Sequence, residues 1–175
     1  MKFRRDDTNY LEGDDIAPTN ANKATIEKYA EKVAKAANFS IGDDPSDVVY
    51  QFGGEVHYED LDDLIVESGS IFVHAEGEFD IIIPQYTSPR RDRFTVGHEL
   101  GHYFLHSKQG EIPIIAFRQG STRIEWEANW FAAALLMPAA AFREACSELS
   151  SSAEIAERFG VSEDAVEVRR KALNA

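Results

Sequence analysis

The chain of 175 residues contains a single cysteine, Cys146, so it cannot form an internal disulfide framework. Proteins that depend on disulfides carry several cysteines, and we therefore expect a reducing compartment and a fold held by its apolar core. In the segment FREACSEL, the expected role of Cys146 is that of a small buried apolar residue. Hydrophobic residues make up 43% of the chain and charged residues 28%, as is typical of a globular domain.

Basic residues are also scarce, with 18 Lys and Arg against 31 Asp and Glu and a net charge of −13. A field of this sign repels phosphate backbones, which argues against bare nucleic acid as the main ligand. It fits either solubility or attraction to a basic protein partner. No stretch approaches the roughly 18 apolar residues that span a bilayer, and the first residues lack the apolar segment of a secretory signal. We therefore expect a cytoplasmic protein without membrane contacts.

The spacing of apolar residues predicts a mostly helical α+β fold in a single domain. Residues 1–20 are polar and acidic and form an N-terminal arm, and residues 21–175 form the domain, which ends in a helical tail from about residue 150. Alternating segments predict a small sheet in the N-terminal half, including a hairpin of SIFVHA and FDIIIPQ. The predicted helices span about 22–38, 47–52, 88–107, 123–137, 139–149, 152–159 and 162 onward.

The segment GHELGHYFLH, residues 97–106, places two histidines and a glutamate on one predicted helix. His98 and His102 are four residues apart, so their side chains share a helix face and can converge on one metal ion. Glu99 lies about 100° around the helix from His98, beside the ion, where it can act as a base toward water. The alternative is a surface helix with incidental histidines.

A third metal ligand is expected from the segment RIEWEANWFAAALLMP, residues 123–138. Glu125 and Asn129 are four apart, so a carboxylate ligand could have the amide as its support. Glu127 lies about 200° from Glu125 on the helix, so both are not expected to bind the same ion. Thr122 and Glu125 also match a capping box, and the spacing alone leaves both roles of Glu125 open.

Three further residues are candidates for supporting the site or binding an oxyanion: Tyr86, Tyr103 and His106. On a straight helix His106 is roughly 12 Å from His98, too far for both to bind one ion. Tyr103 could equally be a half-buried helix residue. The strand FDIIIP could hold an extended substrate by edge pairing or could be a plain core strand, and the two roles are compatible.

Two blocks of this sequence, RFTVGHELGHYFLH (93–106) and EWEANWFAAALLMP (125–138), resemble the ImmA/IrrE family of metallopeptidases. The resemblance implies a zincin-like fold, with the sheet packed on the HExxH helix, and one gluzincin-like Zn²⁺ site per chain. It implies His98 and His102 as ligands, Glu99 as the base and Glu125 as the third ligand, with Glu127 as the fallback.

The resemblance also implies an intracellular protein substrate. Several family members cleave a helix-turn-helix repressor encoded beside them in mobile elements, toxin–antitoxin or stress-response modules. A non-catalytic, zinc-stabilised protein that sequesters a regulator or toxin partner is the alternative. The tail AEIAERFGVSEDAVEVRRKAL resembles two helices joined by a tight turn, but it has no basic face, so we do not expect direct DNA binding.

Overall fold

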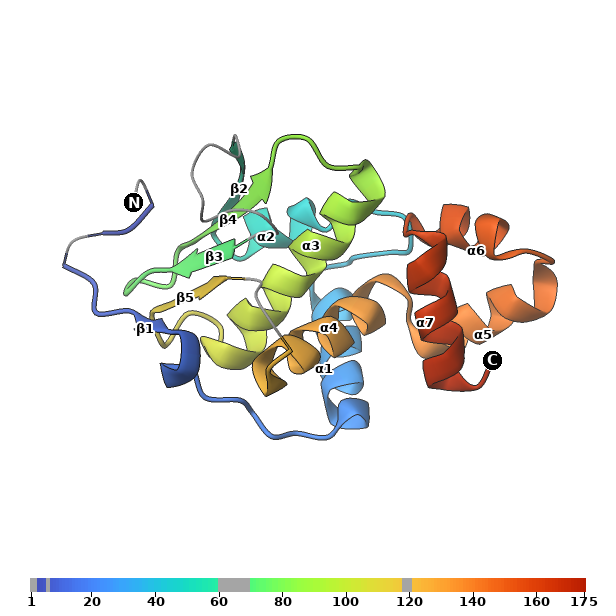
Figure 1. Ribbon diagram of the computed structural model, residues 1–175, viewed down its shortest axis with the longest axis horizontal. Helices are drawn as coiled ribbons and strands as arrows, with labels where there is room; N and C mark the ends of the chain where they lie inside the picture. The colour runs from blue at the N-terminus through green and yellow to red at the C-terminus, as the bar shows by residue number, and fades with distance from the viewer. Residues whose placement is uncertain (1–2, 6, 60–69, 118–120) are drawn as a thin grey trace.

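The helix that carries the HExxH motif lies against one face of a small mixed β-sheet (Figure 1). This is a computed structural model, and it describes residues 3–5, 7–59, 70–117 and 121–175. The strands of these residues follow the spatial order β1-β5-β3-β4-β2. Their bounds are β1 Leu11–Glu12, β2 Gly54–Glu59, β3 Ser70–Val73, β4 Phe79–Pro84 and β5 Ile114–Phe117.

The sheet confirms the predicted hairpin and adds two strands that the sequence did not reveal. β3 and β4 pair antiparallel around a turn at Gly77, whose φ of 87° suits glycine. β5 was expected to be loop, and β1 lies in the N-terminal arm; the two pair in parallel, with Leu11 opposite Ile114. The expected edge role of FDIIIP was wrong, because β4 is bonded on both sides, to β3 and to β2.

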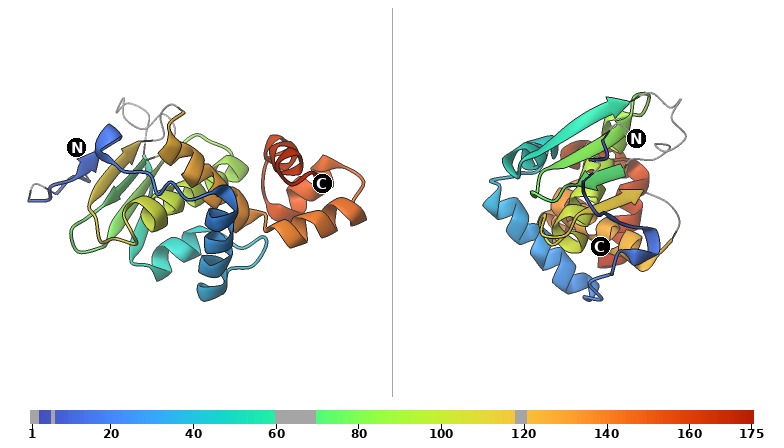
Figure 2. Two further views of the ribbon diagram at one scale, coloured as in Figure 1. Left: turned by 90° about the horizontal axis from the view of Figure 1, so that it is seen from below. Right: turned by 90° about the vertical axis from the view of Figure 1, so that its left-hand side faces the viewer.

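The helices lie where the apolar spacing predicted them, and the chain is an α+β single domain. α3 begins as expected, with the Ser88 side chain as its cap and Pro89 in its first turn. The last three helices gather at the end of the molecule far from the N-terminus (Figure 2). No helix in the described part of the chain is long and apolar enough to cross a membrane. The helices are α1 Lys23–Ala36, α2 Ser46–Gln51, α3 Pro89–Gly101, α4 Arg123–Leu136, α5 Ala139–Glu148, α6 Ser152–Phe159 and α7 Glu163–Leu173.

The predicted helix over 88–107 is not regular throughout. α3 ends at Gly101, and the chain continues as a π-helical turn over His102–His106. The amide of Ser107 donates to the carbonyl of His102, five residues back, at 3.0 Å. Wider turns of this kind are rare and occur frequently at functional sites, here on the second histidine of the motif.

Small residues allow α3 and α4 to cross at unusually short range. Gly97 faces Ala132, and Gly101 faces Ala128, whose Cα would lie 2.8 Å from a Cβ added at Gly101. Glycine is therefore required at 101, whereas at 97 an added Cβ would meet Ala132 at an ordinary 3.4 Å. This crossing brings the histidines of α3 next to the carboxylates of α4.

The N-terminal arm packs against the face of the sheet that the helices leave uncovered. Tyr10 is buried there beside Phe72, and its hydroxyl bonds to Nδ1 of His74 at 2.7 Å. Asp80 accepts hydrogen bonds from both His74 and His57 at 2.7 Å, so both histidines take part in the packing of this face. Tyr10 thus ties the arm to β3, β4 and β5, well before α1 begins.

We predict that Gly101→Ala lowers the free energy of unfolding by about 1–3 kcal/mol, because the clash with Ala128 outweighs the gain in helix propensity. Gly97→Ala is the matched control. It adds the same methyl group to the same helix without a close contact, so its stability should stay within about 1 kcal/mol of wild type. Urea unfolding of both variants tests this. Equal stability of the two variants would contradict the close crossing at residue 101.

Candidate metal centre

Three side chains from α3, the π-helical turn and α4 converge in the interior. Nε2 of His98 and Nε2 of His102 lie 3.1 Å apart. The Glu125 carboxylate reaches both of them, with one oxygen 3.2 Å from His98 Nε2 and the other 3.2 Å from His102 Nε2. All three side chains are buried, and Glu125 retains a 4% exposed fraction. The structure therefore brings together the predicted His98, His102 and Glu125.

Hydrogen bonds on the far side of each ring determine which nitrogen carries the proton. Nδ1 of His98 donates to the Asn129 amide oxygen at 3.0 Å, so its Nε2 presents a lone pair to the centre. Nδ1 of His102 contacts Nδ1 of His106 at 3.0 Å, and Nε2 of His106 donates to Glu127 at 3.1 Å. Burial and the neighbouring His102 lower the pKa of His106 to about 4. A neutral His106 accepts from His102, whose Nε2 also presents a lone pair.

The donor set fits a zinc ion. Two ring nitrogens and two carboxylate oxygens that meet at 3.1–3.2 Å repel one another unless a proton or a cation lies between them. Ligands placed tetrahedrally at about 2.0–2.1 Å from zinc are roughly 3.3 Å apart, close to the observed spacing. Two imidazoles and one carboxylate leave a fourth position open, as in catalytic rather than structural zinc sites.

Glu125 has the charge that a metal ligand needs. Burial acts to raise the pKa of Glu125, but with protons on the Nε2 atoms in place of a cation, hydrogen bonds with His102 and His98 outweigh burial and lower the pKa to about 2. The side chain of Thr122 makes no capping hydrogen bond at the start of α4. The capping-box alternative is therefore not what the structure shows, because the Glu125 carboxylate faces the histidines.

The remaining candidates occupy different environments. Glu99 follows His98 in α3 and is fully buried. Tyr103 lies in the core and stacks on Phe79 with ring centroids 4.0 Å apart, whereas Tyr86 is 76% exposed. Asn129 and His106 support the two histidines, and neither tyrosine takes part in these hydrogen bonds.

Glu127, the fallback ligand, instead anchors the N-terminal arm. It is fully buried and accepts from the backbone and hydroxyl of Thr19 and from the backbone of Asn20, at 2.8–2.9 Å. Arg123 donates to it at 2.9 Å and His106 at 3.1 Å. Burial acts to raise the pKa of Glu127, and these hydrogen bonds lower it. Sequence reasoning missed this role, although a third histidine one turn beyond the motif was a signal that a second carboxylate would be needed.

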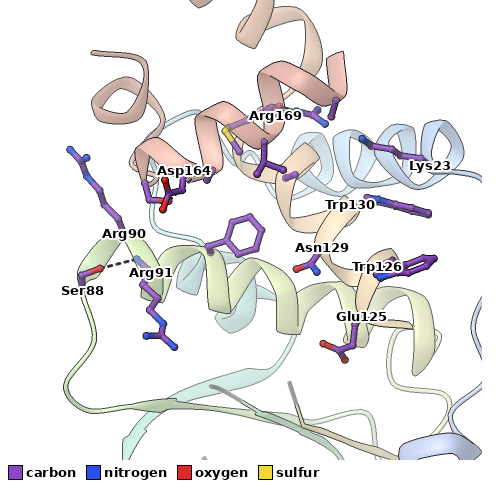
Figure 3. A pocket seen from close by; sticks show the side chains of 17 residues that line it. Lys23, Ser88, Arg90, Arg91, Glu125, Trp126, Asn129, Trp130, Asp164 and Arg169 are labelled. Carbon is purple, nitrogen blue, oxygen red and sulfur yellow. Dashed lines mark hydrogen bonds between the residues drawn. The ribbon is translucent and has the colours of Figure 1, made fainter. Parts of the chain in front are cut away.

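Two hollows reach Glu125 from different sides. The larger has a volume of about 910 Å³ and lies between α3, α4 and α7, as the labelled side chains in Figure 3 show. The smaller, about 400 Å³, is bordered by Gly13 and Ile16 of the arm and by Ala116 of β5. Of the three side chains of the candidate centre, Glu125 is the one that borders both hollows.

A second group of possible metal ligands lies on the sheet, formed by Glu55, His57 and Asp80. Its polar atoms already have partners: Asp80 bonds to both His57 and His74. These side chains are partly or fully exposed, unlike the buried centre between α3 and α4.

Comparison with known families agrees with the centre. The model of the IrrE N-terminal-like domain, peptidase family M78, matches residues 52–171, more than half of the chain. The chain belongs to this family. The match spans His98, Glu99, His102 and Glu125, as well as the C-terminal helices. No curated protein matches the sequence. The chain is thus a member of a metallopeptidase family, and the family implies a bound metal and a protein substrate.

We predict about one zinc ion per chain for the purified protein supplied with zinc, and its loss in Glu125→Ala. Glu127→Ala should keep the ion but bind it about 10- to 100-fold more weakly, since it only orients His102 through His106. Metal content by mass spectrometry and competition with a chelator measure both effects. Zinc lost from Glu127→Ala and kept in Glu125→Ala would reverse the assignment.

Proposed function

We propose that this protein is a zinc-dependent metallo-endopeptidase that hydrolyses a peptide bond in a specific protein. The observation that carries the proposal is the meeting of three acceptor groups, the side chains of His98, His102 and Glu125, beside the buried Glu99. Membership of the metallopeptidase family supports it.

His98, His102 and Glu125 would hold the ion through the two Nε2 atoms and the carboxylate. When bound, zinc polarises a carbonyl oxygen and lowers the pKa of water, which supplies a nucleophile near neutral pH. Asn129 and His106 keep the two rings oriented with their lone pairs inward. Burial keeps bulk water away and strengthens each of these interactions.

Glu99 is the proposed general base. Its position next to His98 in a buried helix segment supports a role in which it accepts a proton from the attacking water and returns it to the amine that leaves. In this assignment Glu99 carries out both proton transfers of the reaction, and Glu125 binds the ion.

The proposed substrate is a DNA-binding regulator, in particular a helix-turn-helix repressor of a mobile-element, toxin–antitoxin or stress-response module. The resemblance to the ImmA/IrrE family supports this, as does the net charge of −13, which attracts a basic DNA-binding partner. We propose that the enzyme acts in the cytoplasm.

Replacement of Glu99 by Gln should lower peptidolysis by at least about 100-fold, because the amide cannot accept the proton. Zinc content should not change, since Glu99 is not a ligand. The measurement is a comparison of newly formed protein N-termini in cells that express wild type or Glu99→Gln. We expect one or a few cleavage sites that are specific to wild type, in a helix-turn-helix protein.

The same pair of strains distinguishes an enzyme from a zinc-stabilised binder. A partner that co-purifies intact with wild type and with Glu99→Gln, without any site specific to wild type, would contradict catalysis. It would favour sequestration of the regulator instead.

A further inference from the structure

The larger hollow beside Glu125, which we call the α3–α7 groove, has a charge opposite to that of the molecule. Four basic side chains and two acidic ones line it, although the whole chain carries −13. Two of the basic side chains, Lys23 and Arg169, pair with Glu27, so the other two carry the excess positive charge. Glu125 is already engaged by His98 and His102. The charged residues are Lys23, Arg90, Arg91, Arg169, Glu125 and Asp164.

Arg90 and Arg91 contribute charge that the fold does not use. Both side chains are exposed, and neither has an ion-pair partner among the described residues. They occupy the first turn of α3, where the helix dipole already concentrates positive charge and acidic residues are preferred. Two arginines thus stand at one end of the groove where the first turn of a helix prefers acidic side chains. This is expected where a ligand supplies the missing negative charge.

Arg169 adds a buried donor to the same groove. It is 1% exposed, and its guanidinium bonds to the Met137 carbonyl and to Glu27. Its Nη2 atom has no hydrogen-bond acceptor within the part of the chain that the structure describes. The fold therefore leaves donor capacity unused in a wall of the groove.

Apolar side chains form much of the rest of the groove. Trp126 is 46% exposed and Val168 68% exposed, and both line it together with Phe94 and Trp130. Figure 3 shows Arg90 and Arg91 at one end and Glu125 near Trp126 and Asn129 at the other. A volume of about 910 Å³ is near the upper limit for ligand pockets and accommodates a peptide segment rather than one side chain.

We propose that the α3–α7 groove binds a segment of the protein substrate in which an apolar residue is followed or preceded by acidic residues. The apolar side chain packs on the tryptophans, and the carboxylates reach Arg90 and Arg91. Along α3, Arg90 and Arg91 are about 10–12 Å from His98. An extended chain covers this distance in about three or four residues, so the acidic residues lie three or four positions from the scissile bond.

This inference rests on the proposed function, since it takes the occupant of the groove to be the protein that is cleaved. An acidic segment in the groove is compatible with a substrate whose net charge is positive. Charges further apart than roughly 8–10 Å are screened, so the net charge guides the encounter while the groove selects the local segment.

Binding can be tested without turnover, on zinc-loaded Glu99→Gln. The probe is a fluorescein-labelled peptide with a central Phe and with Asp and Glu three and four positions away, and the reference peptide has Lys in their place. Anisotropy should show binding of the acidic peptide at least about tenfold tighter. Arg90→Glu with Arg91→Glu should remove this preference, and Arg90→Lys with Arg91→Lys should retain most of it.

The matched control is Lys28→Glu with Lys32→Glu. It makes the same change in net charge on the exposed face of α1, outside the groove, and should change affinity by less than about twofold. Equal binding of the two peptides, or equal effects of the two charge reversals, would overturn the proposal. So would a single-stranded oligonucleotide that binds the groove more tightly than the acidic peptide.

Cleavage of a mixed peptide library by wild type separates this proposal from the proposed function. The groove predicts acidic residues three or four positions from the cut, and a KM about tenfold higher in the arginine double variant with little change in kcat. Cleavage without that preference would contradict substrate binding in the groove and would leave the proposed peptidase activity intact. If Glu99→Gln binds the acidic peptide but wild type cleaves nothing, the result would support binding of an acidic segment in the groove. It would contradict the proposed peptidase activity.

Discussion

The repulsion among three acceptor groups between α3 and α4 is the constraint on which the site depends. Two imidazole nitrogens and a carboxylate meet at 3.1–3.2 Å. Hydrogen bonds behind the two imidazoles hold the rings in place, from Asn129 and from the pair of His106 and Glu127. A fold that holds like groups together in this way requires a cation or a proton. The close crossing at Gly101 brings the two helices near enough for the three groups to meet.

The N-terminal arm is connected to the same centre. Glu127 joins the arm to His106, and His106 joins Glu127 to a proposed metal ligand, so one buried carboxylate serves both packing and orientation. This explains why two glutamates two positions apart in α4 have different partners. They project from different sides of the helix, Glu125 toward the α3 histidines and Glu127 toward the arm and His106.

The features that sequence could reveal were those with a local period or spacing. The cap at Ser88, the hairpin of β3 and β4 and the HExxH helix follow from neighbouring residues, and the structure agrees with each. β1 and β5 could not be predicted in this way, since each is short and is formed by pairing between segments about 100 residues apart. The role of Glu125 could not be predicted from local sequence either. Its spacing fits both a capping box and a metal ligand, and only the position of α3 beside α4 distinguishes the two roles.

The most direct test of the account is an anomalous-scattering measurement at the zinc edge on crystals grown with zinc. The account predicts one strong peak per chain, about 2.0–2.1 Å from His98 Nε2, His102 Nε2 and the Glu125 carboxylate. A peak beside Glu55, His57 and Asp80 with none between α3 and α4, or no peak at all, would contradict it.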